Sequence, residues 1–210
     1  TVNSDLAISG SEITANGGYG VAFRGGMTQE EAVAADASEY NKLTIADSAI
    51  KAELFAIAGN GTTHGTVITV SGDSKIESTN GVAIYHPQYG ILNIALNEGG
   101  AQAYIRGLSG IEMRAGALNV ESGLVSEPNG NGSTTEGAAV AIVQHTTKLP
   151  INVALSGGTY KGQYALYEEN QQQNEPEAIK KISISVTGGV YEGNIGSQDV
   201  TGFISGGKFA

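Results

Sequence analysis

The 210-residue sequence contains no cysteine and no tryptophan. Without cysteine the chain has no disulfides and no thiolate ligands for a metal ion. Without tryptophan it lacks the largest side chain for stacking on sugar rings, although tyrosine can take that role. No apolar run approaches the roughly 20 residues that a membrane-spanning helix needs. We therefore expect neither a disulfide-bonded domain nor direct membrane insertion.

Positive charge is also scarce in this sequence. Lys and Arg together number 11 against 21 Asp and Glu, which gives a formal net charge of −10. Binding to phosphate backbones and anionic membranes depends on cationic contacts, so nucleic acid is not expected as a partner. Solubility explains the acidity, and calcium binding is the alternative explanation.

Proline is rare, at four residues, whereas glycine is abundant, at 31. No G-X-Y period accompanies the glycine, so the chain is not collagen-like. Glycine adopts positive φ angles at little cost and therefore suits a chain that turns every few residues. The hydrophobic share of 40 % is typical of a folded rather than a disordered chain.

A repeating unit is the main signal in the sequence. Each unit opens with alternating apolar residues and a small turn, and a second short apolar run follows later in the unit. The first runs are Leu6-Ala-Ile8, Leu43-Thr-Ile45, Ile68-Thr-Val70, Leu92-Asn-Ile94, Leu118-Asn-Val120, Val153-Ala-Leu155 and Ile184-Ser-Val186, and Ile204 begins one more unit. The second runs include Gly20-Val-Ala-Phe-Arg24, Leu54-Phe-Ala-Ile-Ala58, Gly81-Val-Ala-Ile-Tyr85, Gly110-Ile-Glu-Met-Arg114, Ala139-Val-Ala-Ile-Val143 and Tyr164-Ala-Leu-Tyr167.

The phase of these runs predicts stacked strands. Apolar positions alternate with period two, so each strand has one buried face. Two such strands per unit cannot enclose a core alone, but stacked units give every strand a parallel neighbour above and below. An antiparallel β-sandwich is the competing fold, and it does not predict the same residue type at the same phase of each unit. We therefore predict an all-β chain that forms a parallel β-helix of about seven coils.

The run Ser156-Gly-Gly-Thr-Tyr160 is echoed by Thr187-Gly-Gly-Val-Tyr191 and Ser205-Gly-Gly-Lys-Phe209. It resembles the SGGTF repeats of secreted bacterial surface proteins, which are similar to the pectate-lyase-like superfamily. The likeness spans nearly the whole chain. It implies a single-stranded right-handed parallel β-helix in an extracellular, cell-surface location. It does not specify a function, because that superfamily contains lyases, hydrolases, phage tailspikes and non-catalytic adhesins.

Three segments interrupt the repeat within one predicted domain, residues 1–210. Residues 27–42 form a predicted helical insertion, with Thr28 as N-cap and Glu31 completing a capping box. This insertion follows the first coil, and we expect it to cover the open end of the solenoid. Polar loops are predicted at 126–137 and 168–179. Because the sequence stops inside a repeat unit, we expect a fragment of a longer protein, with any export signal and anchor outside it.

No catalytic set stands out in the sequence, and we predict no catalytic residue, no metal site and no cofactor. His64, His86 and His145 do not share one phase of the repeat, as a histidine metal site would require. The best polar row lies at the second run of each unit and its exit, where in-phase residues of parallel strands are about 4.8 Å apart. We predict there a ligand-binding ladder of Arg24, Asn60, Tyr85, His86, Glu112, Arg114, Gln144, His145, Tyr167 and Glu168. The alternative is an ordinary solvated face.

Three functions remain open on this basis. The first is a non-catalytic extracellular surface module, an adhesin or stalk that binds glycans or host surface proteins. The second is a polysaccharide-acting lyase or glycoside hydrolase, although no pair of carboxylic acids at the separation such chemistry needs is evident. The third is a structural surface protein that self-associates through the ends or flanks of its solenoid.

Overall fold

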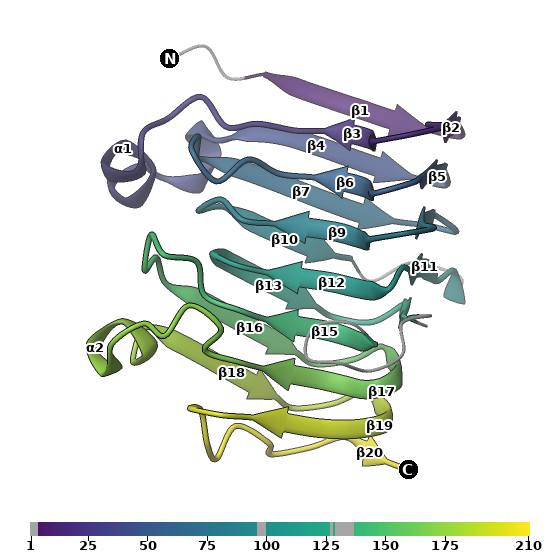
Figure 1. Cartoon of the computed structure of the whole chain (residues 1–210). Helices are drawn as coiled ribbons and strands as arrows, with labels where there is room; N and C mark the ends of the chain where they lie inside the picture. The colour runs from purple at the N-terminus through teal and green to yellow at the C-terminus, as the bar shows by residue number, and fades with distance from the viewer. Residues whose placement is uncertain (1–3, 96–99, 127, 129–136) are drawn as a thin grey trace.

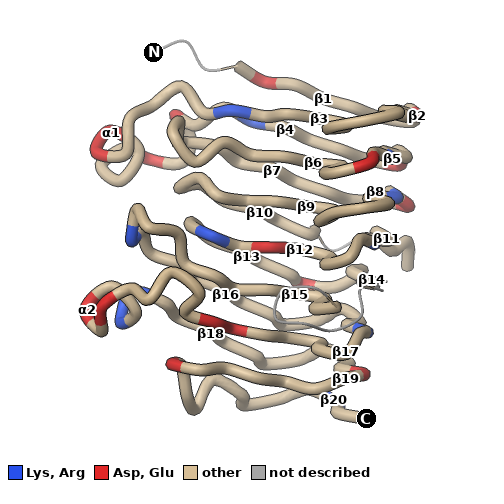
Figure 2. The backbone as a smooth tube through the Cα atoms, viewed as in Figure 1, with Lys and Arg blue, Asp and Glu red and all other residues tan. Residues whose placement is uncertain are grey.

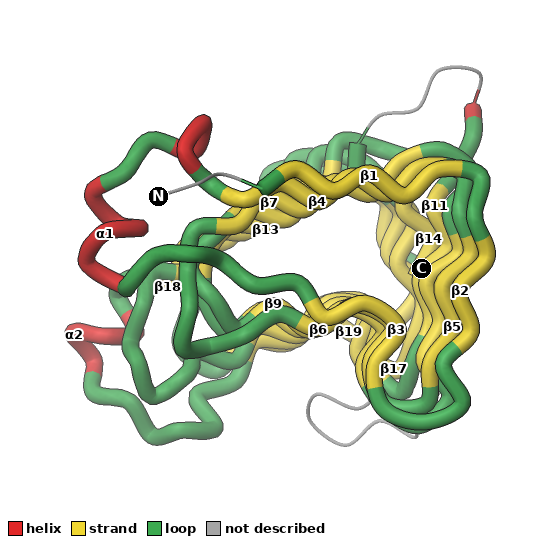
Figure 3. The backbone as a smooth tube through the Cα atoms, turned by 90° about the horizontal axis from the view of Figure 1, so that it is seen from above, coloured by secondary structure: helices red, strands yellow, loops and turns green. Residues whose placement is uncertain are grey.

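In the computed structural model, residues 4–95, 100–126, 128 and 137–210 are described. These residues form an all-β fold with two short α-helices and one 3-10 turn. Within them, every pairing between named strands is parallel. The strands lie in three rows around a common interior, which is clearest from above (Figure 3). This arrangement is consistent with the predicted parallel β-helix.

The three rows are defined by their strands. Row A is a seven-stranded sheet of β1 (Asp5–Ser9), β4 (Asn41–Ala46), β7 (Thr66–Ser71), β10 (Ile91–Ile94), β13 (Gly116–Val120), β16 (Ile151–Leu155) and β18 (Ile182–Val186). Row B contains β2 (Glu12–Thr14), β5 (Ala49–Ala52), β8 (Lys75–Ser78), β11 (Ala103–Arg106), β14 (Leu124–Ser126) and β20 (Lys208–Phe209). Row C contains β3 (Tyr19–Ala22), β6 (Phe55–Ala58), β9 (Val82–His86), β12 (Ser109–Met113) and β15 (Ala138–Ile142). The longer strands β17 (Thr159–Glu168) and β19 (Val190–Ser197) run through both rows B and C and join them into one sheet.

The register keeps like residues in line, as the repeat predicts. In row A, Leu43, Ile68, Leu92 and Leu118 are consecutive register partners. All four point inward and are at most 1 % exposed. Burying side chains of this size contributes roughly 1.5–3 kcal/mol each before the entropic cost of ordering them. The stacked aliphatic rows are therefore the core that holds the coils together.

The two positions of each glycine pair in the SGG motif require glycine for different steric reasons. A Cβ at Gly188 would lie 2.1 Å from the carbonyl oxygen of Ser156 in the preceding coil, so the first glycine permits close backbone approach. Gly189 has φ +95°, a conformation that strains other residues, so the second glycine permits the turn. The pairs Gly157-Gly158 and Gly206-Gly207 repeat this arrangement.

The aromatic residue after each glycine pair points into the interior. Tyr160 and Tyr191 are fully buried and stacked, with ring centroids 4.7 Å apart, and Phe209 stacks on Tyr191 at 5.2 Å. The Tyr160 hydroxyl donates to the Gly157 carbonyl at 2.7 Å, and the Tyr191 hydroxyl donates to Gly188 at 2.9 Å. Each ring thus fills the core while its hydroxyl is satisfied by its own turn. Both tyrosines therefore belong to the core.

The predicted insertion contains a helix but does not cover the end of the strand rows. Helix α1 (Gln29–Ala34) begins at Thr28 with the predicted capping box, and the 3-10 turn η1 (Ala37–Glu39) follows. Buried Met27, Ala32 and Tyr40 pack with Val67 and Tyr89 of later coils. The insertion therefore lies against the flank of the molecule, beside row A (Figures 1 and 3). The expectation of an end cap is wrong, because the apolar side of α1 contacts this flank.

Of the two predicted loops, the structure describes little of the first and shows a helical turn in the second. The segment 126–137 falls mostly outside the described residues. The segment 168–179 ends in a helical turn, α2 (Pro176–Ile179), that the sequence pattern did not predict. Asn174 anchors the segment, since its Nδ2 donates to Gln144 Oε1 at 3.0 Å. Helices α1 and α2 lie on the same side of the molecule (Figure 3).

Candidate functional site

The outward face of row C brings part of the predicted ladder together. Tyr85 on β9 and Glu112 on β12 are register partners on adjacent strands. Arg114 follows Glu112 by two residues and therefore continues on the same face. The next partners in line are Ala141 and then Tyr167, so an alanine separates Tyr167 from the charged pair. The polar row is thus continuous over β9 and β12 and is interrupted by an alanine at β15.

An aromatic strip leads up to this pair from the first coils. It consists of Tyr19 on β3, Phe55 on β6 and Tyr85 on β9. The Tyr19 and Phe55 ring centroids are 5.2 Å apart, and those of Phe55 and Tyr85 are 5.1 Å apart. Tyr19 is 51 % exposed, and the other two rings are partly exposed. The strip is therefore a solvent-accessible surface of π-faces that crosses three coils.

Arg114 joins the aromatic strip to a group of polar side chains. Its guanidinium carbon lies 6.0 Å from the centre of the Tyr85 ring, within the range of a cation–π contact. Its Nε donates to Glu112 Oε1 at 2.5 Å, and its second terminal nitrogen donates to Gln171 Oε1 at 3.4 Å. Burial raises the pKa of the Tyr85 hydroxyl, and the opposing charge of Arg114 does not outweigh that effect. The hydroxyl therefore stays a neutral donor and acceptor over the ordinary pH range.

Glu169 adds a second carboxyl near the same guanidinium. Burial raises its pKa, while the Arg114 charge acts in the opposite direction. Its Oε2 is buried and has no hydrogen-bond partner. Glu112, in contrast, is bound directly to Arg114. Two carboxyl groups in different surroundings are thus close to one arginine.

A shallow depression of about 340 Å³ lies at this point of the surface. Its wall includes Phe55, Tyr85, Glu112 and Arg114, together with Gly81 and Leu108. An acidic and a basic segment lie close together at β12 and just beyond its end, and other strands such as β8 carry charges too (Figure 2). The depression therefore combines an apolar aromatic side with one concentrated ion pair.

Three predicted ladder members do not reach the surface. His86, Gln144 and Glu168 are at most 1 % exposed, because their side chains point into the interior. The Nδ1 atom of His86 lies 3.1 Å from the Ala115 carbonyl, and burial lowers the pKa of the ring to about 4. Glu168 Oε2 accepts from the Ser197 hydroxyl at 2.6 Å and from the Asp199 amide at 3.0 Å. These polar groups support the interior and cannot contact a ligand on the outer face.

The remaining members of the ladder lie apart from the depression. Arg24 is exposed beyond the end of β3. Asn60 is engaged in its own turn, where Oδ1 accepts from the Thr62 amide at 2.8 Å. His145 lies in the turn after β15 and accepts from the Thr147 amide through Nδ1 at 3.4 Å. Tyr167 packs against Tyr164 with the two rings tilted by 44° and their centroids 4.5 Å apart.

Sequence reasoning missed Phe55 and Tyr19. Each is the first residue of a row C strand. Tyr19 and Phe55 are register partners, and Phe55 is also the register partner of Val82. An apolar residue in a short apolar run is normally assigned to the core. Alternation gives no better signal, because Phe55 is two residues from Ile57, which is fully buried. Only the partial exposure of Phe55 and its ring contact with Tyr85 place it at the surface.

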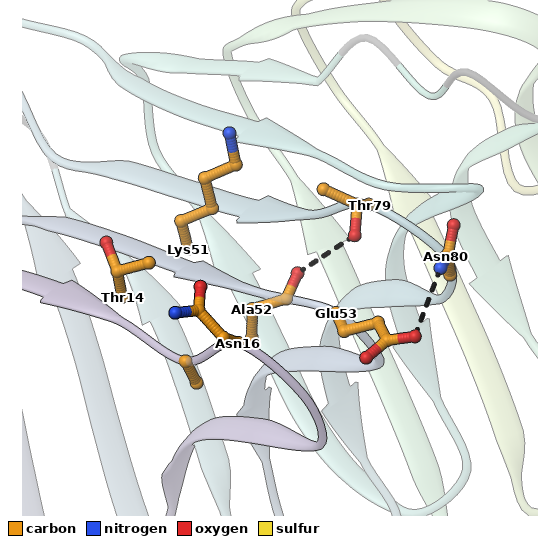
Figure 4. A pocket seen from close by; sticks show the side chains of 8 residues that line it. Thr14, Asn16, Lys51, Ala52, Glu53, Thr79 and Asn80 are labelled. Atoms are coloured by element: carbon orange, nitrogen blue, oxygen red, sulfur yellow. Dashed lines mark hydrogen bonds between the residues drawn. The ribbon is translucent and has the colours of Figure 1, made fainter.

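A second depression, of about 270 Å³, lies near the turns that connect rows B and C in the first coils (Figure 4). Its lining residues are Thr14, Ala15, Asn16, Lys51, Ala52, Glu53, Thr79 and Asn80. The Asn80 amide donates to Glu53 at 3.4 Å, and the Thr79 hydroxyl donates to the Ala52 carbonyl at 3.5 Å. No aromatic ring lines it, so it offers a ligand less contact than the row C depression.

Comparison with protein-family models, with curated proteins and with solved structures finds no match to this chain. Among the described residues, no three His, Asp or Glu side chains gather in a way that could hold a metal ion. No helix in the described ranges is long and apolar enough to cross a membrane. Functional inference therefore rests on the geometry of the row C face.

Proposed function

We propose that this chain is a right-handed parallel β-helix module of the pectate-lyase-like kind, displayed outside a bacterial cell, that binds glycans without cleaving them. One observation carries the proposal: the aromatic strip of Tyr19, Phe55 and Tyr85 ends at the Arg114–Glu112 pair over an open depression. Sugars present apolar C–H faces to aromatic rings and hydroxyls to charged side chains, so this combination fits a neutral oligosaccharide.

The ion pair argues for a neutral rather than an acidic sugar. Arg114 is already bound by Glu112 at 2.5 Å and lies near Glu169, so its charge is largely balanced. A uronic acid carboxylate would lie close to the Glu112 carboxylate that is bound to Arg114, and the two negative charges would repel each other. A hydroxyl can instead donate to Glu112 and accept from the free N–H groups of Arg114, with the pair intact.

Binding is testable with a glycan array followed by isothermal titration calorimetry on any glycan that gives a signal. Tyr85→Ala is expected to weaken binding about tenfold, because it removes the ring that contacts both Phe55 and Arg114. Arg114→Ala is expected to weaken binding several-fold. Tyr104→Ala is the matched control, since Tyr104 is a partly exposed tyrosine of row B. Equal losses in Tyr85→Ala and Tyr104→Ala, or a silent array, would contradict the proposal.

A polysaccharide-acting enzyme is the second candidate. It is favoured by one feature, the pair Glu112 and Glu169 beside Arg114, in which burial raises the pKa of Glu169. A glycosidase uses such different environments to give its general acid a higher pKa than its base or nucleophile. A reducing-sugar release assay on the glycans that bind distinguishes the two. Release that is abolished in Glu112→Gln, with binding retained, would replace the binding module with the enzyme.

A further inference from the structure

The row C depression has an aliphatic side and a charged side. Val82 is the first residue of β9 and Leu108 immediately precedes β12, and both side chains are partly exposed. Glu112 and Arg114 lie at the other end of β12, and all four residues line the depression. Three to four residues of extended strand separate the two sides, a distance of about 10–13 Å. A single sugar ring with its substituents can therefore touch both sides at once.

The aliphatic side has no counterpart in an unsubstituted hexose. A sugar ring that stacks on Tyr85 directs its equatorial groups sideways, toward the walls of the depression. On the charged side its hydroxyls meet Glu112 and Arg114, which exchange hydrogen bonds with them. On the other side a hydroxyl would lose water against Val82 and Leu108 and gain no hydrogen bond, which opposes binding. A substituent that carries a methyl group fits this side better than a hydroxyl does.

Asn80 places a hydrogen-bond acceptor beside the aliphatic side. It is exposed and lines the same depression. Its Nδ2 donates to Glu53 Oε1 at 3.4 Å, and the amide oxygen points away from Glu53 (Figure 4). Within the described part of the chain, no donor binds this oxygen. Asn80 Oδ1 is therefore available to accept a hydrogen bond from a ligand.

Gly81 keeps the space between the acceptor and the aliphatic side open. A Cβ at Gly81 would lie 2.0 Å from the carbonyl oxygen of Leu54 in the preceding coil. The position therefore carries no side chain, and only backbone separates Asn80 from Val82. An N–H group and a methyl group that belong to one small substituent can thus reach both residues.

We propose that the row C depression binds a 2-acetamido sugar. The acetamido methyl group packs on Val82 and Leu108, its N–H donates to Asn80 Oδ1, and hydroxyls across the ring bind the Glu112–Arg114 pair. The acetamido group is neutral, which agrees with the balanced charge of Arg114. This inference rests on the proposed glycan binding and narrows its ligand from neutral sugars in general to N-acetylated ones.

The test compares sugars that differ only in the acetamido group. Chitotriose and cellotriose have the same linkage and ring stereochemistry, and the first carries an acetamido group where the second carries a hydroxyl. Isothermal titration calorimetry is expected to show chitotriose binding about tenfold more tightly, because one methyl contact and one hydrogen bond are gained. N-acetylgalactosamine and galactose repeat the comparison with a different hydroxyl stereochemistry.

Two variants locate the preference. Leu108→Ser removes half of the aliphatic side, and Asn80→Ala removes the acceptor. Each is expected to lower the ratio of the two triose affinities about threefold, with an unchanged circular dichroism spectrum because both side chains reach the surface. Asn152→Ala is the control, since Asn152 is an exposed asparagine on row A, and it should leave the ratio unchanged.

Equal affinities within both pairs of sugars would overturn the acetamido inference while leaving glycan binding in place. The inference also fails if neither acetamido sugar binds, and only a silent glycan array then removes the proposed function with it. A chitotriose preference that persists in both Leu108→Ser and Asn80→Ala would mean that another part of the surface recognises the acetamido group, which overturns the inference as well.

Discussion

At the scale of single residues, His86 shows how a polar side chain is held in the interior. Its ring is fully buried, with Nδ1 placed 3.1 Å from the Ala115 carbonyl and Nε2 without a hydrogen-bond partner. Burial disfavours the charged ring and lowers its pKa from 6.5 to about 4, although the contact with the carbonyl acts in the opposite direction. The folded state therefore holds His86 neutral at pH values where the unfolded chain protonates it.

This difference predicts a stability loss in acid. The unfolded state binds a proton below about pH 6.5 and the folded state only below about pH 4, so stability falls as the pH drops through that window. The loss reaches about 3 kcal/mol by pH 4. His86→Gln is expected to remove this part of the pH dependence in urea denaturation measured from pH 7 to pH 4. His145→Gln, with a partly exposed ring, is the control. Identical pH profiles for wild type and His86→Gln would contradict the prediction.

The residues of the candidate site were partly predictable. The sequence nominates the adjacent pairs Tyr85-His86 and Tyr167-Glu168, and successive side chains of a strand point to opposite faces, so one of each pair had to be internal. Its charge alone predicts an outward position for Glu168. The side chain points inward because Ser197 and Asp199 donate hydrogen bonds to its carboxylate, and these partners come from the next coil, so local sequence does not reveal them.

At the scale of elements, the insertion behaves as a separate unit attached to the strand rows. Its capping box is local and was visible in the sequence, so the start of α1 at Thr28 was predictable. Its docking is not local, since Tyr40 and Ala32 meet Val67 and Tyr89, which lie later in the chain. Helix α2 was missed because it has only four residues and begins with a proline, which gives no periodic signal.

The docking of α1 is testable with a pair of neighbouring substitutions. Ala32 is fully buried, and Ala32→Glu places a charge in that contact, which should release the insertion. Hydrogen exchange over residues 29–39 is expected to become fast, while the strands of row A stay protected, because their register does not involve α1. Val33→Glu is the control, since Val33 is 53 % exposed. Loss of protection throughout row A would show instead that α1 is required for the strand rows.

At the scale of the whole molecule, each coil contacts mainly the coil before it and the coil after it. Stability in such an architecture is approximately a sum over neighbouring coils, so the terminal coils are the least stable part. The inward residues of row A follow the phase of the repeat and were predictable. Row B was not, because the sequence pattern indicated two strands per unit and the structure has three rows. The position of the insertion was not predictable either, because α1 packs on the flank against residues of later coils.

Two side-chain truncations in row A, one in a central coil and one in the first coil, compare the stability of these coils. Ile94→Ala, at a central and fully buried position, is expected to lower the free energy of unfolding by about 3 kcal/mol. Ile8→Ala, in the same line but only partly buried on β1, is expected to cost about 1 kcal/mol or less. Both values come from urea denaturation under conditions where the chain is monomeric. Equal costs at the two positions would mean that the terminal coil is as well covered as the central one.

The stack of Tyr160, Tyr191 and Phe209 also gives the molecule an optical property. With no tryptophan in the sequence, tyrosine dominates the near-ultraviolet spectrum. The Tyr160 and Tyr191 rings are nearly parallel, at 13° and 4.7 Å, so their electronic transitions couple and report on the last coils separately from the rest of the chain. Burial raises the pKa of both hydroxyls, so the signal stays that of neutral tyrosine well into alkaline solution. The C-terminal coils thus contain an intrinsic chromophore pair, and Phe209 stacks on its second member, Tyr191.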